Sequence, residues 1–153
     1  MSTSSLNKSI YLDTSVLSAL FDERTPERKN MTETFWGTLP QHNVFISTLV
    51  RDEVQAATDL LREKLIEKIK EFTILEITHE SEELAQNYLD HDVFSERYRS
   101  DALHVGTAVV HRIEYLISWN FTHLVKVRTR KSVNLLNSLK GYPNIEIIAP
   151  PEF

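Results

Sequence analysis

Four polar residues of this chain have types and spacings that suit metal-dependent chemistry. They are Asp13, Glu53, Asp101 and Asn120. The segments IYLDTSV, DALHVGT and LISWNF, which hold three of them, contain no Lys or Arg that could neutralise a carboxylate. Carboxylates that converge without cationic partners repel one another unless a divalent cation neutralises them. Because oxygen ligands select hard ions, the pattern predicts a site for Mg²⁺ or Mn²⁺ rather than for zinc.

Each of these positions alone also has an ordinary structural explanation. Asp13 follows the apolar run IYL, and it could simply cap the helix that begins there. Asp101 opens a helical segment, where a first-turn acid interacts favourably with the helix dipole. Asn120 follows another apolar run, and Asn is a common turn former. The prediction of a metal site therefore depends on the residues together.

The position of Glu53 depends on the helix expected to begin at Leu49. On a helical wheel with 100° per residue, Glu53 falls within the apolar arc that contains Leu49, Val50 and Val54. A carboxylate that points into a core is costly unless it is paired or binds a metal, and a salt bridge at the edge of the core is the alternative.

His104 falls toward the polar side of its helix, which indicates a neighbour of the site rather than a ligand.

The elements that must position these residues alternate along the chain. Short apolar runs rich in Ile, Val, Tyr and Phe predict strands at 9–13, 44–47, 74–78, 115–118 and 145–148. Amphipathic segments predict helices at 15–21, 26–36, 49–71, 81–88, 101–112 and 132–139. This alternation predicts an α/β fold, three-layer α/β/α, with a central and mostly parallel sheet. Ligands of such sheets bind beyond the carboxyl ends of the strands.

Composition limits what kind of protein this is. With 153 residues and no internal linker or repeat, a single domain over residues 1–153 is expected. The 3 glycines lie at positions 37, 106 and 141, which excludes the glycine-rich loops that bind nucleotide phosphates. The lack of cysteine excludes disulfides, thiolate zinc sites and thiol nucleophiles. Without a charged-then-apolar leader or a long apolar run, we expect a soluble, cytoplasmic protein with no membrane association.

The chain also resembles a known family. The segments IYLDTSVLSAL, ISTLVRDEV, DALHVGTAVVHRIEYLISWNFTHL and IEIIAPPEF resemble the PIN domain, in particular the VapC-type toxins of toxin–antitoxin pairs. The resemblance implies a central parallel sheet flanked by helices and a Mg²⁺- or Mn²⁺-dependent endoribonuclease, a hydrolase of RNA phosphodiester bonds. It implies a catalytic set of Asp13, Glu53, Asp101 and Asn120, with Asp13 and Asp101 holding the metal and the hydroxyls of Ser15 and Ser118 beside them.

One departure from the family pattern affects the metal count. Many members carry an aspartate where this chain has Asn120, and an amide contributes no charge. We therefore expect weaker occupancy of any second metal, and one-metal catalysis becomes an alternative. A catalytically silent PIN-like binding or assembly module is the alternative function. A phosphohydrolase that forms an aspartyl phosphate at Asp13 is disfavoured, because the motif reads DTS rather than DxD.

The charges of the chain are unevenly distributed. The formal net charge is -5, yet residues 112–140 hold 6 basic and 1 acidic side chains. Five of these cations follow Asn120, and four of them are predicted to contact RNA phosphates: Lys126, Arg128, Arg130 and Lys131. A solvated protein surface is the alternative interpretation. The resemblance further implies an antitoxin partner and a homodimer.

Overall fold

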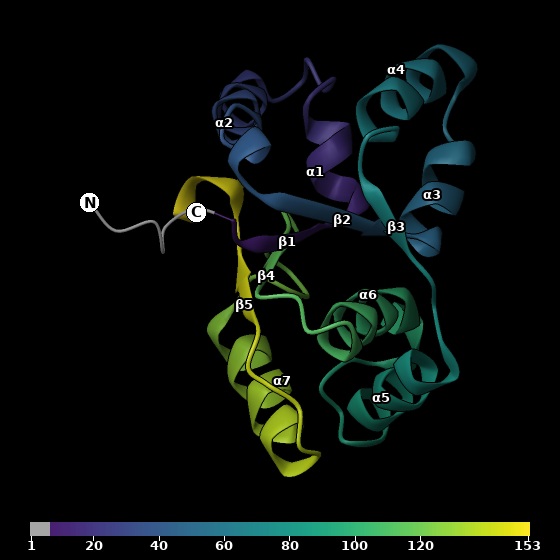
Figure 1. Cartoon of the computed structure of the whole chain (residues 1–153), viewed down its shortest axis with the longest axis vertical. Coiled ribbons are helices and arrows are strands. Elements are labelled where there is room, and N and C mark those ends of the chain that lie inside the picture. Colours follow the sequence, from purple (N-terminus) through teal and green to yellow (C-terminus); the bar gives the residue numbers. More distant parts are fainter. Residues whose placement is uncertain (1–6) are drawn as a thin grey trace.

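The computed structural model describes residues 7–153, and its strands alternate with helices along the chain (Figure 1). The strands are β1 (Ser9–Leu12), β2 (Asn43–Ser47), β3 (Thr73–Leu75), β4 (Tyr115–Ile117) and β5 (Glu146–Ile148). The helices are α1 (Thr14–Ala19), α2 (Pro26–Trp36), α3 (Thr48–Gln55), α4 (Asp59–Ile69), α5 (His79–Asp90), α6 (Arg99–Val110) and α7 (Val127–Leu139). No helix in this described part is long and apolar enough to cross a membrane. Residues 1–6 of the predicted domain lie outside the described residues.

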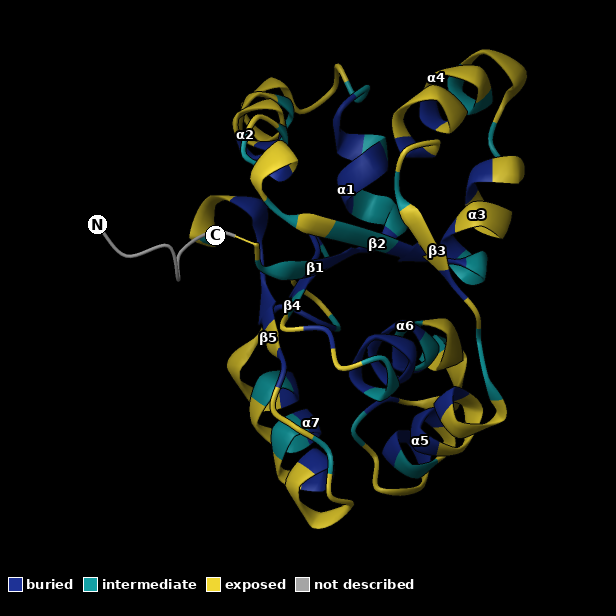
Figure 2. Cartoon of the chain, viewed as in Figure 1, coloured by how far each residue is buried: buried dark blue, intermediate teal, exposed yellow. Residues whose placement is uncertain are grey.

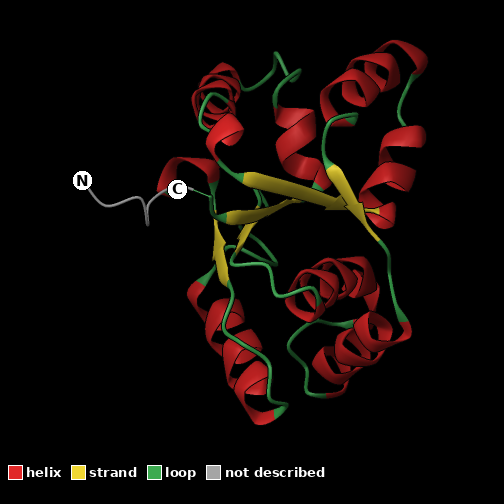
Figure 3. Cartoon of the chain, in the orientation of Figure 1, coloured by secondary structure: helices red, strands yellow, loops and turns green. Residues whose placement is uncertain are grey.

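The strands form one parallel sheet with helices on both faces, as predicted. Their order is β3-β2-β1-β4-β5, and every neighbouring pair runs parallel. Helices α1 to α4 cover one face, and α5, α6 and α7 cover the other (Figures 1 and 3). The three-layer α/β/α architecture is therefore confirmed.

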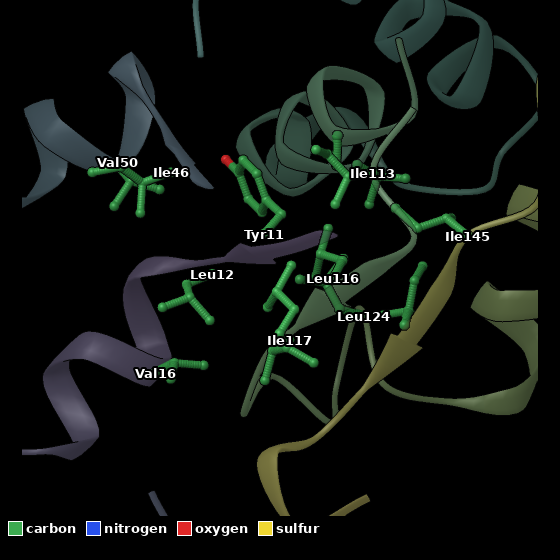
Figure 4. Close-up of a cluster of buried hydrophobic side chains, with 14 of the residues drawn as sticks. Tyr11, Leu12, Val16, Ile46, Val50, Ile113, Leu116, Ile117, Leu124 and Ile145 are labelled. Atoms are coloured by element: carbon green, nitrogen blue, oxygen red, sulfur yellow. The ribbon is translucent and has the colours of Figure 1, made fainter. Parts of the chain in front are cut away.

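The central strands are apolar because both of their faces are covered. Tyr11 and Leu12 point to opposite sides of β1 and are fully buried (Figure 4). Leu116 and Ile117 on the neighbouring β4 are also fully buried, and they pack in the same cluster. Burial follows the layers, so that the helices are buried on the sides that face the sheet and exposed on their outer sides (Figure 2).

Helix α6 is an exception, because it is buried on nearly all sides. Residues 104 to 109 are buried without interruption. Gly106 allows the backbone of α5 to approach closely, since a Cβ at this position would lie 2.9 Å from the carbonyl oxygen of Ser81. Helix α6 is thus enclosed between the sheet and α5, and polar side chains on it can be buried as well as apolar ones.

Two predicted helices differ from the structure. The helix predicted at 49–71 is two helices, because α3 ends at Gln55 and α4 begins at Asp59 after the extended Thr58. The helix predicted at 132–139 begins earlier, at Val127, and therefore includes several of the basic residues. Local apolar periodicity does not reveal a break that leaves both halves amphipathic, nor a first helical turn that is strongly charged.

The strand order places a crevice at the carboxyl ends of β1 and β4. From β1 the chain crosses to β2 on one side, while β4 pairs with β1 on the other side. Leu12 pairs with Ile117, so the residues that follow these two emerge side by side. This is the switch point at which open α/β sheets bind their ligands.

Candidate active site

Asp13 lies at this switch point, where β1 ends and α1 begins. Its carboxylate accepts hydrogen bonds from the backbone N–H of Ser15 at 3.1 Å and from the hydroxyls of Ser15 and Ser118, the latter at 2.6 Å. Asp13 is thus the N-cap of α1, as its alternative explanation suggested. It is also only 5% exposed, and burial raises the pKa of its carboxyl in spite of these hydrogen bonds. Burial therefore makes the ionised form of Asp13 unfavourable, although the residue caps a helix.

Ser15 and Ser118 tie the ends of β1 and β4 together around Asp13. The Ser15 hydroxyl accepts a hydrogen bond from the backbone N–H of Trp119 at 2.9 Å. The Ser118 hydroxyl accepts one from the backbone N–H of Asn120, also at 2.9 Å. Since each hydroxyl donates to the carboxylate and accepts from the loop after β4, the two serines fix the orientation of Asp13. The structure thus places both predicted serines beside Asp13.

Asp101 approaches the same crevice from the first turn of α6. Burial raises the pKa of its carboxyl, and the negative charges of Asp13 and Glu53 raise it further, while His104 and His123 act in the opposite direction. The three carboxylates therefore belong to one electrostatic cluster, which we call the acidic cluster: Asp13, Glu53 and Asp101. Two of its members, Asp13 and Asp101, are held in the folded protein with raised pKa values.

Glu53 joins the acidic cluster, although it does not point into the core as predicted. Its side chain is 39% exposed. The prediction was wrong because the apolar arc was drawn for one continuous helix, whereas α3 ends two residues after Glu53 and Leu60 is 69% exposed on α4. The alternative interpretation, an ion pair at the edge of the core, is closer to the structure, since Glu53 Oε1 lies 2.9 Å from His104 Nε2.

His104 also lies elsewhere than the sequence predicts. It was expected toward a polar helix face, yet it is 4% exposed. Its Nδ1 lies 2.7 Å from the hydroxyl of Tyr11, and the same hydroxyl lies 2.8 Å from Ser47 Oγ. A signal for this burial was present, because residues 102–110 contain no Lys, Arg, Asp or Glu, which is typical of a helix covered all round.

Asn120 lies in the loop directly after β4, close to Ser118. Its side-chain oxygen accepts a hydrogen bond from the backbone N–H of His123 at 2.9 Å, as expected of a turn former. His123, which the sequence argument did not single out, stacks on Tyr98 with the ring centroids 3.6 Å apart. The structure therefore brings Asn120 to the crevice but uses one lone pair of its amide oxygen within the loop.

The groups of the crevice suit a hydrated hard cation better than a metal enclosed by protein ligands. Among residues 7–153, no three His, Asp or Glu side chains are grouped closely enough to hold a metal by themselves. Mg²⁺ commonly binds through one or two carboxylates and keeps several waters or substrate phosphates as its other ligands. Asp13 and Asp101 fit that requirement, because their donors are oxygens and a nearby cation would favour the ionised carboxylates, which burial disfavours.

The four predicted RNA-binding cations line two different hollows. Lys126 and Arg128 line a hollow of about 230 Å³ at the start of α7. Arg130 and Lys131 line a different hollow of about 400 Å³. Arg130 also lies 3.8 Å from the carboxylate of Glu152. Lys126 and Arg128 are therefore better placed than Arg130 to meet a ligand.

Comparison with known proteins agrees with this geometry. The PIN domain family model matches residues 10–120. No curated protein sequence gives a match.

Several solved structures share the fold. The VapBC2 complex from Rickettsia felis bound to a promoter DNA fragment is 15% identical with a TM-score of 0.57, covering 92% of this chain and 98% of that chain. A toxin–antitoxin complex from Klebsiella pneumoniae is 22% identical with a TM-score of 0.61, covering 79% and 94%. VapC20 from Mycobacterium tuberculosis, a toxin that cleaves the sarcin–ricin loop, is 18% identical with a TM-score of 0.58, covering 90% and 99%.

At these identities the solved structures establish the fold alone. The family model, in contrast, extends from β1 to the loop after β4 and so includes every member of the acidic cluster. Because this match covers well over half of the 153 residues, the chain belongs to the PIN domain family.

Proposed function

We propose that this protein is a Mg²⁺- or Mn²⁺-dependent endoribonuclease, acting as a single domain in the cytoplasm. The observation that carries the proposal is the meeting of Asp13 and Asp101 at the strand switch point, where burial raises the pKa of both carboxyls and the negative charge of Asp13 raises the pKa of Asp101 further. A purely structural site would not be expected to retain this unfavourable charge, whereas a site that binds a cation requires it.

In the proposed mechanism the residues of the crevice have separate roles. Asp13 and Asp101 would hold the cation, and Ser15 and Ser118 fix the carboxylate of Asp13. When bound, the cation supplies stabilisation of charge on the scissile phosphate and lowers the pKa of the attacking water. Glu53, 39% exposed at the rim, would orient the attacking water through Oε2, while Oε1 is bonded to His104. Asn120 shapes the loop after β4 through its bond with His123, and its amide nitrogen would help to orient the same water.

A cleavage assay tests the proposal directly. The purified wild type and the variants Asp13→Asn and Asp101→Asn are each incubated with a mixed RNA pool, with Mg²⁺, with Mn²⁺ and without added metal. Cleavage that needs the metal and is lost in both variants is the expected result. Asp52→Asn is the matched control, because Asp52 is exposed on α3 next to Glu53. It should cleave like the wild type.

The silent binding module remains the second candidate function. The observation that favours it is the amide oxygen of Asn120, which is engaged by His123 and adds no charge to the crevice. The same assay separates the two, since a wild-type protein that does not cleave with either metal supports the silent module.

We further propose that the protein is the toxin of a toxin–antitoxin pair and forms a homodimer. Support comes from the folds that resemble it, which include toxin–antitoxin complexes from Rickettsia felis and Klebsiella pneumoniae. Expression of the wild type should arrest bacterial growth, and Asp101→Asn should not. Co-expression of the product of an adjacent reading frame should restore growth. Light scattering on the purified protein checks the dimer.

A further inference from the structure

We propose that His104 is a positioning residue that holds Glu53 in the crevice through a buried chain of hydrogen bonds. The chain runs from Ser47 to Tyr11, then to His104, and ends at the carboxylate of Glu53. The inference rests on the proposed nuclease function, and it adds three residues to the machinery of that site.

The inner members of this chain are closed off from solvent. Ser47 and Tyr11 are fully buried, and His104 is 4% exposed. The three contacts measure 2.8 Å, 2.7 Å and 2.9 Å. Figure 4 shows the Tyr11 hydroxyl directed away from Leu116 and Ile117, toward the side of Ile46 and Val50. Only the last member of the chain, Glu53, reaches the surface.

The direction of the hydrogen bonds follows from the chemistry of the groups. An ionised carboxylate can only accept, so His104 donates its Nε2–H to Glu53. The other ring nitrogen, Nδ1, bonds the hydroxyl of Tyr11, which is also bonded to Ser47 Oγ. Both ring nitrogens therefore have a partner, and the orientation of the ring is fixed.

Each inner member of the chain lies on a segment that carries, or leads directly to, one carboxylate of the acidic cluster. Tyr11 lies on β1, and Asp13 directly follows this strand. Ser47 is the N-cap of α3, which carries Glu53. His104 lies on α6, one turn after Asp101. The chain therefore joins the strand and two helices on opposite faces of the sheet, and it fixes the three carboxylates relative to one another.

Glu53 needs such support more than the other two carboxylates. Asp13 is fixed by two serines, and Asp101 is half-buried at a helix start. Glu53 is longer and 39% exposed, so its side chain would sample several rotamers without His104. The bond to Oε1 selects one of these rotamers and leaves Oε2 free to meet water or a cation. Groups that orient metal-site ligands in this way typically contribute about 10- to 100-fold to activity or metal affinity.

Two substitutions of His104 separate the halves of its role. His104→Asn keeps an acceptor near the Tyr11 hydroxyl but is too short to reach Glu53. His104→Gln keeps a donor that reaches Glu53. We expect His104→Asn to lower kcat about 10- to 100-fold with little change in KM, and His104→Gln to restore most of kcat. His111→Asn is the matched control, because His111 caps the other end of α6 and bonds the carbonyl of Glu76.

A double-mutant cycle excludes a role in folding alone. In single-turnover reactions, adding His104→Asn to a Glu53→Gln background should change the residual rate less than about twofold. An equal loss in both backgrounds would overturn the proposal, because His104 would then act independently of Glu53. Unchanged kcat in His104→Asn would overturn it as well.

A spectroscopic measurement tests the same contact without any activity. The histidine side-chain nitrogens of ¹⁵N-labelled protein should show His104 protonated on Nε2, with a proton that exchanges slowly with water. Replacement of Glu53 by Ala should shift that proton and speed its exchange, while His111 stays unchanged. If His104 does not respond, the proposal is wrong. If the wild type proves inactive with Mg²⁺ and Mn²⁺, the nuclease function fails instead, and this spectrum alone decides whether His104 holds Glu53.

Discussion

Two groups of buried polar side chains in this protein differ in charge. The acidic cluster at the switch point contains Asp13 and Asp101, whose carboxyl pKa values are raised chiefly by burial. A second group, which we call the amide cluster, consists of Tyr88 on α5 with Asn134 and Asn137 on α7. It contains no group that is charged at neutral pH.

The amide cluster is fully paired. Tyr88 donates its hydroxyl to Asn137 Oδ1 at 2.5 Å, and both side chains are fully buried. Asn134 donates to the carbonyl of Ile145 at 3.0 Å and accepts from its N–H at 2.8 Å. Neutral groups that find their partners in this way stabilise the packing of α5, α7 and the segment before β5.

The difference indicates which cluster serves the fold and which serves function. Buried neutral groups with satisfied hydrogen bonds add to the free energy of unfolding. Carboxylates with raised pKa values lower the free energy of unfolding at neutral pH. Proteins retain such groups mainly where activity needs them. Substitutions in the acidic cluster should therefore change activity, and those in the amide cluster should change stability.

The largest effect is expected for Asp101→Asn. Loss of one metal ligand should reduce RNA cleavage by roughly 100- to 1,000-fold, equivalent to about 3 to 4 kcal/mol of transition-state stabilisation. Because the variant removes an unfavourable buried charge, its free energy of unfolding without metal should equal or exceed that of the wild type. Cleavage rates and urea unfolding measure the two quantities. If the variant is inactive only because it unfolds, the acidic cluster serves stability, and its expected difference from the amide cluster is contradicted.

Tyr88→Phe should have the opposite profile. The variant leaves the buried oxygen of Asn137 without its donor, which costs about 1 to 2 kcal/mol of unfolding free energy. Cleavage measured well below the unfolding temperature should stay at the wild-type rate, because the amide cluster contains none of the proposed active-site residues. Loss of cleavage in a folded Tyr88→Phe protein would show that the two clusters are coupled.

The pH dependence of stability offers a finer test of the acidic cluster. The pKa of Asp101 is raised in the folded protein above its ordinary value of 3.8, so the folded state binds this proton more tightly than the unfolded state does. Its contribution to stability is therefore present below the ordinary pKa and is lost as the pH rises through the raised pKa. Urea titrations in a chelating buffer should show Asp101→Asn gaining stability relative to the wild type as the pH rises. A difference that is constant with pH would contradict the raised pKa.

The smallest effect is expected from the basic residues of α7, a helix that also carries part of the amide cluster. Arg128→Glu should weaken RNA binding and reduce the slope of log K against log salt by about 1. Arg130→Glu is the matched comparison, since Arg130 lies near Glu152 and lines a different hollow. It should affect binding less. Equal effects of the two substitutions would indicate that both arginines contact RNA phosphates, as the sequence predicts.

The sequence alone located the parts of the site that depend on local pattern. Asp13 and Asp101 are fixed by the end of an apolar strand and the start of a helix, and these boundaries are visible in the residues themselves. The alternation of strands and helices likewise predicts a covered parallel sheet, because each apolar run must be buried. Both predictions follow from local sequence, and neither requires knowing which helix packs against which strand.

The tertiary structure decided the rest of the site. Whether a helical face is buried depends on what packs against it, so the sequence placed Glu53 too deep and His104 too near the surface. The close approach of α5 at Gly106 encloses α6, and the break after Gln55 exposes part of α3. The contact between Glu53 and His104 joins residues 51 positions apart, on helices from opposite faces of the sheet. Such a contact is set by the strand order, which no local pattern in the sequence specifies.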